Sequence, residues 1–217
     1  MAQIEPANQI LALITIYSFN TIYIRDSIMS LRKKIGSLFL KSRGWTVVNE
    51  IPADIRKCVC IVAPHTSIED FFVGWAFFWS QGLHFKMMMK AEFFKYPILR
   101  GLLLKLGAIP VNRGHRNNLV EQMIDMFSKN DEVFLVICPE ATRKKVNQWK
   151  RGFYHIAEGA NQPIVFGFMD FQKKRCGFDK VMIPSSDYEK DLAEIWDYYK
   201  DIKAKFPEKF NLDEQYR

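Results

Sequence analysis

The sequence has few cysteines, and their spacing suggests neither a metal site nor a disulfide framework. The four are Cys58, Cys60, Cys138 and Cys176 among 217 residues, and no spacing among them resembles a zinc site. We therefore expect no bound metal and reduced, mostly buried thiols, as in a cytoplasmic protein. Cys58 and Cys60 stand in one apolar run, and we expect their side chains to point to opposite faces of a strand.

A hydrophobic run that would convincingly span a membrane is also lacking. The most apolar stretch near the start, residues 10–24, contains Thr15, Ser18, Asn20 and Thr21, whereas a spanning helix needs about 20 apolar residues. No basic residue precedes this stretch and no small-residue cleavage site follows it, so we do not expect a signal peptide.

Internal repeats, low-complexity linkers and known nucleic-acid motifs are absent too, so we expect one domain. The formal net charge is +7. Residues 1–150 hold 20 basic against 12 acidic side chains, and residues 151–217 hold 11 against 12. A basic surface attracts nucleic acids, anionic lipid headgroups or acidic substrates, and charge alone does not choose among them. Because the charge forms no dense stripe, we expect no nucleic-acid partner.

Residues 29–40 combine basic and apolar side chains at helical spacing. Arg32, Lys33 and Lys34 stand among leucines, isoleucine and phenylalanine. Two interpretations stay open. The helix lies in a membrane interface, or it packs on the domain as an ordinary helix.

From Trp45 onward, strand-like and helix-like segments alternate. We expect strands over 46–50, 58–63, 84–89, 108–111, 132–138, 163–171 and 178–183, with a hairpin turn over 173–177. We expect helices over 70–81, 93–106 with a break near Pro97, 119–127 and 152–160, and a final helix marked by Leu192, Ile195, Tyr199, Ile202 and Phe206. This order predicts a single α/β domain with a mostly parallel central sheet, helices on both faces and an N-terminal helical segment.

Ionisable side chains follow the buried strand 58–63. His65 comes just after its end and Asp70 begins the next helix, and ligands bind beyond the carboxyl ends of strands in such sheets. A histidine can act as a general base, and an aspartate one turn on can fix its tautomer. Ser67 and Asp70 also fit a helix capping box, which is the structural alternative.

Two further strand ends carry polar groups. Arg113 follows the strand 108–111, and Pro139-Glu140-Ala141-Thr142-Arg143 follows the strand 132–138. The planar guanidinium of arginine matches phosphate oxygens. The alternative is that these arginines, with Lys144 and Lys145, are solvated surface charges.

In this order, the blocks resemble the lysophosphatidate acyltransferase family, also called the 1-acylglycerol-3-phosphate or glycerophospholipid acyltransferases. His65 and Asp70 match the family's first motif, H-x-x-x-x-D. Its second motif, a G-x-I-x-x-x-R-like block, is matched by Gly107, Ile109 and Arg113.

The third and fourth motifs follow in register. The third, P-E-G-T-R, is matched by Pro139, Glu140, Thr142 and Arg143, and the fourth, an apolar strand opened by proline, by Pro163-Ile164-Val165. Ala141 replaces the glycine of the third motif. We expect its methyl group either to crowd the acceptor or to demand a negative φ.

The resemblance implies an O-acyltransferase in which His65 and Asp70 activate a glycerolipid hydroxyl toward acyl-CoA or acyl carrier protein, with no further cofactor. It implies that Arg113, Glu140, Thr142, Arg143 and Gly107 bind the acceptor, a lysophosphatidate-like lipid. Residues 45–217 are then the acyltransferase domain. The N-terminal residues lie outside the resemblance, and from their composition we interpret residues 1–44 as an apolar and basic helical segment that can anchor the domain to the cytoplasmic face of a membrane. The alternative function is a non-catalytic peripheral membrane or lipid-binding protein, and a thioester hydrolase is a further one.

Overall fold

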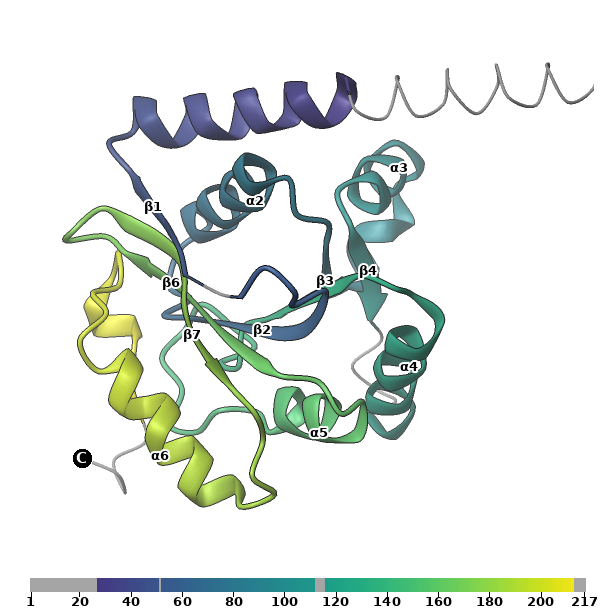
Figure 1. Cartoon of the computed structure of the whole chain (residues 1–217), viewed down its shortest axis with the longest axis vertical. Coiled ribbons are helices and arrows are strands. Elements are labelled where there is room, and N and C mark those ends of the chain that lie inside the picture. Colours follow the sequence, from purple (N-terminus) through teal and green to yellow (C-terminus); the bar gives the residue numbers. More distant parts are fainter. Residues whose placement is uncertain (1–26, 51, 112–115, 213–217) are drawn as a thin grey trace, which may run out of the picture.

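A central sheet organises the molecule. A computed structural model describes residues 27–50, 52–111 and 116–212, and within them seven strands pair in the order β1-β7-β6-β2-β5-β3-β4 (Figure 1). The strands are β1 Thr46–Asn49, β2 Lys57–Ala63, β3 Phe85–Lys90, β4 Ala108–Val111, β5 Val133–Ile137, β6 Ile164–Asp170 and β7 Arg175–Met182.

The sheet is mostly parallel, as the sequence predicts. Strands β6, β2, β5, β3 and β4 all run in one direction. Strands β1 and β7 are parallel to each other, and β7 is antiparallel to β6. A turn of four residues, 171–174, joins β6 to β7, and so short a connection can join only antiparallel strands. The turn is shorter than the expected 173–177.

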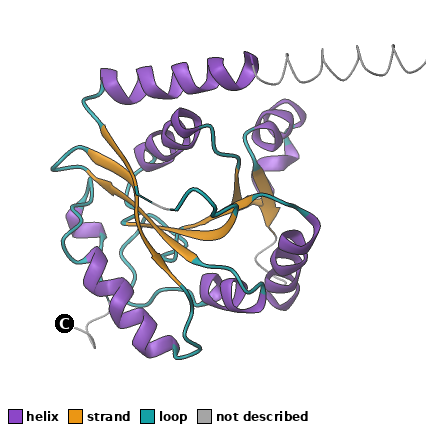
Figure 2. Cartoon of the chain, in the orientation of Figure 1, coloured by secondary structure: helices purple, strands orange, loops and turns teal. Residues whose placement is uncertain are grey.

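Helices cover both faces of the sheet, as Figure 2 shows. On one face lie α2 (Glu69–Gln81) and a helix described over 27–42. On the other lie α4 (Arg116–Lys129), α5 (Gly152–Gly159) and α6 (Tyr188–Tyr199). The 3-10 helix η1 (Ala91–Lys95) and α3 (Pro97–Lys105) lie outside these layers, at the β3–β4 edge of the sheet. A second 3-10 helix, η2 (Pro207–Lys209), follows α6. Helix α3 begins at Pro97, where a break was expected.

The helix over 27–42 packs on α2. A Cβ at Gly36 would lie 2.5 Å from the Ala76 carbonyl oxygen, so this glycine allows the two backbones to approach closely. Leu40 is 1% exposed, whereas Leu31 and Leu38 are 58% and 70% exposed. The packed interpretation therefore holds for the inner side of the helix, and its outer side carries exposed apolar and basic side chains. Residues 10–24 lie outside the described part.

The final helix is shorter than its apolar spacing predicts. Helix α6 ends at Tyr199, and Ile202 and Phe206 lie in the segment that follows. Pro207 disfavours helical backbone at Phe206, whose φ and ψ are −122° and 85°. The amide of Phe171 donates to the Lys203 carbonyl at 2.9 Å. Tertiary hydrogen bonds and a proline thus override the helical pattern.

The expectation for Cys58 and Cys60 was wrong. Their sulfur atoms are 3.4 Å apart in the core against α2, because side chains two residues apart in a strand share a face. All four cysteines are free thiols. Across the described residues, every helix is too short or too polar to cross a bilayer.

Candidate active site

The carboxyl ends of the parallel strands bring His65, Asp70 and Glu140 together. His65 lies in the loop between β2 and α2, and Asp70 is in the first turn of α2. Strand β5 pairs in parallel with β2, with Ile61 opposite Ile137. Glu140, three residues beyond β5, therefore emerges beside the loop that carries His65.

The carboxylate of Asp70 holds the His65 loop. Its Oδ2 lies 3.2 Å from Nδ1 of His65 and accepts hydrogen bonds from the amides of Thr66 and Ser67, each at 2.8 Å. The side chain of Asp70 is 1% exposed and that of His65 is 22% exposed. A buried acceptor thus fixes an imidazole whose outer edge reaches solvent.

This contact sets the tautomer of His65. A carboxylate oxygen only accepts, so Nδ1 must carry the hydrogen, and in the neutral imidazole Nε2 then has a free lone pair. The capping box is only half formed. Asp70 accepts from the Ser67 amide, but Ser67 Oγ accepts from the Glu69 amide at 3.1 Å, so the carboxylate serves the loop and the histidine together.

The second oxygen of Asp70 is unusual. Oδ1 is fully buried and has no hydrogen-bond partner among the described residues. Buried polar atoms in native proteins rarely lack a partner, and each exception calls for an explanation such as a catalytic role or a bound water.

Glu140 supports the same loop from the other side. Its Oε2 accepts the His65 amide at 2.7 Å, and the residue is 3% exposed. Burial raises the pKa of Glu140 to about 8. The negative charge of Asp70 adds to the rise, and the hydrogen bond from His65 partly opposes it. At neutral pH this carboxyl is therefore mostly protonated, which leaves Asp70 as the main negative charge beside the imidazole.

In the described structure, the imidazole of His65 hydrogen-bonds to Asp70 and to no nearby hydroxyl or thiol. Ser67 Oγ is engaged with the Glu69 amide, and Thr66 Oγ1 accepts from the Phe206 amide at 3.3 Å. Burial, together with the charges of Glu140 and Asp70, raises the pKa of the Cys138 thiol far above its ordinary range. A thiol held in its neutral form is a poor nucleophile.

The segment after β5 forms a tight turn. The Ala141 amide donates to the Cys138 carbonyl at 2.9 Å. Ala141 adopts φ = 55°, so the expectation of a negative φ was wrong: the turn keeps the left-handed backbone that a glycine would favour. Thr142 Oγ1 accepts from the Lys144 amide at 3.3 Å, and Arg143 is exposed.

The two residues of the second motif are placed differently. Strand β4 ends at Val111, at the same edge as His65, and Arg113 lies outside the described residues. Gly107 precedes β4, at the opposite edge of the sheet. Its φ is 86°, and a Cβ there would lie 2.2 Å from the Phe85 carbonyl oxygen. The structure does not bring Gly107 to His65 and Asp70, and its position favours a backbone role.

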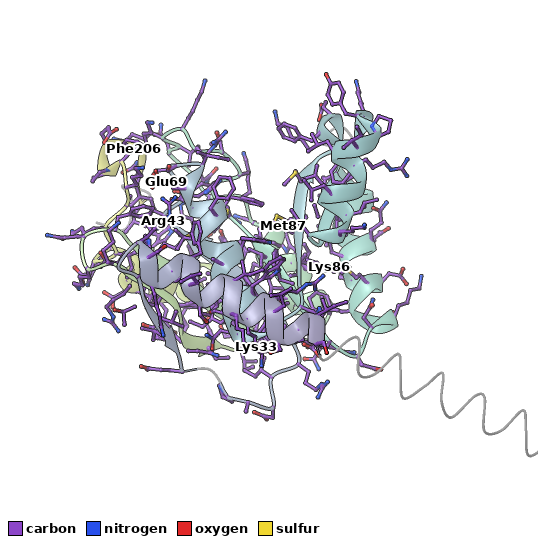
Figure 3. All side chains as sticks on the ribbon, turned by 90° about the horizontal axis from the view of Figure 1, so that it is seen from above. Lys33, Arg43, Glu69, Lys86, Met87 and Phe206 are labelled. Atoms are coloured by element: carbon purple, nitrogen blue, oxygen red, sulfur yellow. The ribbon has the colours of Figure 1, made fainter. Side chains whose placement is uncertain are left out.

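The segment after α6 also supports the site, and none of the site residues predicted from the sequence lies in it. Besides the bond from Phe206 to Thr66, Lys205 forms an ion pair with Glu69 at the start of α2. Figure 3 shows Glu69 and Phe206 close together. None of the four motifs includes these residues, so the sequence offered no signal for them.

Comparisons with known proteins agree with this geometry. Residues 46–166, more than half of the chain, match the sequence model of the Acyltransferase family. No curated protein matches the sequence. The crystal structure of the 1-acyl-sn-glycerophosphate (LPA) acyltransferase PlsC from Thermotoga maritima is similar, with a TM-score of 0.62, over 90% of this chain and 89% of that chain, at 17% identity. The chain therefore belongs to the Acyltransferase family, is an enzyme of that type, and has the fold of PlsC.

Proposed function

We propose that the enzyme transfers a fatty acyl group from acyl-CoA or acyl carrier protein to the hydroxyl of a lysophosphatidate-like glycerolipid. The observation that carries this proposal is the contact between buried Asp70 Oδ2 and His65 Nδ1. It leaves Nε2 of a partly exposed imidazole able to accept a proton from an incoming hydroxyl.

The chemistry needs no covalent enzyme intermediate. Nε2 of His65 takes the acceptor's proton as the hydroxyl oxygen attacks the thioester carbonyl. The tetrahedral intermediate then collapses, the carbon–sulfur bond breaks, and the departing thiolate takes the proton back from His65. Asp70 stabilises the imidazolium between these steps. Direct transfer is supported by the neutral Cys138 thiol and by the imidazole of His65, which bonds to no hydroxyl among the described residues.

Glu140 is a positioning residue in this scheme. It holds the His65 amide and, because it is mostly protonated, adds little charge to a site that already contains Asp70. Recognition of the acceptor phosphate falls to Arg113 and Arg143. Exposed Arg143 is free of any carboxylate contact within 4.0 Å in the described part of the chain, and guanidinium groups suit phosphate oxygens.

The proposed location is the cytoplasmic face of a membrane, because the acceptor is a lipid. Residues 1–44 would contribute to attachment. In their described part, Leu31 and Leu38 are exposed beside Lys33 and Lys34, a composition that suits an interface.

The test is to incubate the purified protein with labelled acyl-CoA or acyl carrier protein and a panel of lysophospholipids. Acylated lipid is expected, and release of free fatty acid alone would instead identify a hydrolase. His65→Ala should abolish transfer without changing the melting curve. His155→Ala is the matched control, because His155 is exposed on α5, away from the three site residues.

A second arm tests recognition of the acceptor. Arg143→Ala should raise the KM for the acceptor far more than the KM for the donor, and Arg175→Ala, at an exposed arginine on β7, should change neither. Equal effects of Arg143→Ala on both substrates would assign this arginine to the donor or to the fold.

A further inference from the structure

The segment 90–105 is an apolar surface that the fold leaves uncovered. We call it the η1–α3 platform. Phe93, Tyr96, Ile98 and Leu102 are 50%, 68%, 93% and 54% exposed, and Leu103 is the platform's buried residue at 8%. Single exposed apolar residues are ordinary, but a contiguous group of them marks an interaction surface.

Basic side chains surround this apolar group. Lys90, Lys95, Arg100 and Lys105 are all exposed, against the single acidic residue Glu92. In the described chain, none of the four lies within 4.0 Å of a carboxylate. The platform therefore presents uncompensated positive charge around exposed rings and aliphatic side chains.

The platform begins at the edge of the sheet that carries the site, and α3 runs back from there toward the start of β4 at the opposite edge. Strand β3 runs parallel to β5, as β2 does, so the end of β3 at Lys90 lies at the same edge as His65 and Glu140. Helix η1 follows directly, and Figure 1 shows α3 outside the sheet beside β3 and β4. Whatever binds the η1 end of the platform is held at the edge of the sheet where His65 lies.

We propose that the η1–α3 platform is a docking surface for the anionic phospholipid bilayer. The apolar side chains enter the boundary between headgroups and acyl chains, and the four basic side chains contact lipid phosphates. This inference deepens the proposed function and rests on it for its purpose: docking here delivers a lipid acceptor to the edge where His65 lies. The contact is additional to any made by residues 1–44.

Charge argues against a second copy of the chain as the occupant. A two-fold interface uses the same patch on both subunits, which would place four cations against four cations. Like charges across an interface oppose association. An anionic lipid surface satisfies the same charges and the apolar group together.

The experiment is vesicle sedimentation of the full chain, with phosphatidylcholine vesicles that either contain or lack phosphatidylglycerol. Ile98→Ser should lower partitioning onto anionic vesicles about tenfold. Ile183→Ser is its control, because Ile183 is 70% exposed and follows β7, whose end lies at the opposite edge. Lys95→Glu should lower partitioning at least about fivefold, and on anionic vesicles only. Lys190→Glu, which changes an exposed lysine on α6, should leave partitioning unchanged.

Further readouts separate this proposal from the proposed function. Both platform variants should keep wild-type melting curves and wild-type turnover of a short-chain acceptor in free solution, since neither residue touches the site. Vesicle binding is measured without acyl transfer, so it tests the platform even if the enzyme acylates no lipid. Wild-type vesicle binding by both variants would overturn the proposal that the platform docks on the bilayer. So would a changed mass in light scattering with unchanged vesicle binding, which would assign the surface to self-association.

Discussion

Two buried carboxylates of this enzyme are used in opposite ways. Asp191, 4% exposed on α6, has both oxygens engaged: Oδ2 accepts from Tyr154 Oη and the Ser185 amide, and Oδ1 accepts from Ser185 Oγ, at 2.7–2.8 Å. Asp70 is equally buried, but its three contacts converge on Oδ2 and leave Oδ1 without a partner in the described structure.

The surroundings of the two carboxylates differ in electrostatics as well. Burial alone would raise the pKa of Asp191, but the hydrogen bonds from Ser185 and Tyr154 outweigh it and lower the pKa. Beside Asp70, the second carboxyl, that of Glu140, has a pKa raised by burial. A fully satisfied carboxylate anchors the fold, whereas Asp70, with one oxygen left unsatisfied in the described part of the chain, holds the proposed catalytic imidazole at some cost in stability.

Asp70→Asn should give the largest effect. The amide oxygen can take the place of Oδ2 and keep all three contacts, which puts the NH₂ group at the buried position of Oδ1, where it has no acceptor among the described residues. The neutral amide also removes the negative charge that stabilises the imidazolium as His65 takes up a proton. We expect kcat to fall by about 10²–10⁴-fold with KM for the acceptor unchanged. Steady-state kinetics of Asp197→Asn, an exposed aspartate on α6, provide the control. Near wild-type kcat for Asp70→Asn would contradict the scheme.

Glu140→Gln should change how stability depends on pH. The pKa of Glu140 is about 8 in the folded protein and near its ordinary 4.5 when unfolded. Between these values the unfolded chain binds fewer protons, so the free energy of unfolding falls as pH rises, by a few kcal/mol at most. Glutamine does not titrate, and the variant should lose less stability over that range. Urea unfolding across the range measures the slope, and parallel curves for the two proteins would refute it.

Asp191→Asn should show the opposite pH dependence. Because folding lowers the pKa of Asp191, its carboxylate stabilises the folded protein above pH 3.8, the ordinary pKa. That stabilisation is lost as the pH falls through the pKa of the folded state. We expect the variant to unfold with about 2 kcal/mol less free energy at neutral pH, and to approach wild type in acid. The kcat of the variant should not change, because Asp191 and its partners Tyr154 and Ser185 do not contact His65. A large loss of kcat in a folded Asp191→Asn variant would contradict the distinction in which Asp191 stabilises the fold and Asp70 acts with His65.

Ala141→Gly should have the smallest effect. The left-handed φ of 55° strains an alanine, while glycine adds freedom to the unfolded chain. The two contributions nearly cancel, so the free energy of unfolding, measured by thermal denaturation, should change by about 1 kcal/mol or less. Ala160→Gly, at φ = −89°, has no strain to relieve and should only destabilise. Equal losses for both variants would show that the Ala141 turn is unstrained.

Much of the fold and the contact between His65 and Asp70 could be predicted, because both depend on local patterns. Buried strands such as β2 and β5 are continuous apolar runs, and Pro97 marks the start of α3. The contact of His65 with Asp70 depends on a strand end, a short loop and one helical turn, all contained in six residues.

The rest depends on contacts between distant residues. The bond from the His65 amide to Glu140 joins residues 75 positions apart and follows from the β2–β5 register, which composition does not specify. The early end of α6 reflects Pro207 and the bonds to the C-terminal segment, which compete with an otherwise helical pattern. The side chains of the η1–α3 platform have apolar spacing much like that of core segments, and only the structure shows that they are exposed.

The hydrogen bond between the Phe206 amide and Thr66 joins residues 140 positions apart. At about 5–20 residues per second, a ribosome needs roughly 7–28 s to synthesise the chain between them. Over that interval the loop that carries His65 has emerged, but its last support has not been made. The nascent chain therefore completes this site only after α6 and the segment beyond it have left the ribosome, well after the loop that carries His65 has emerged.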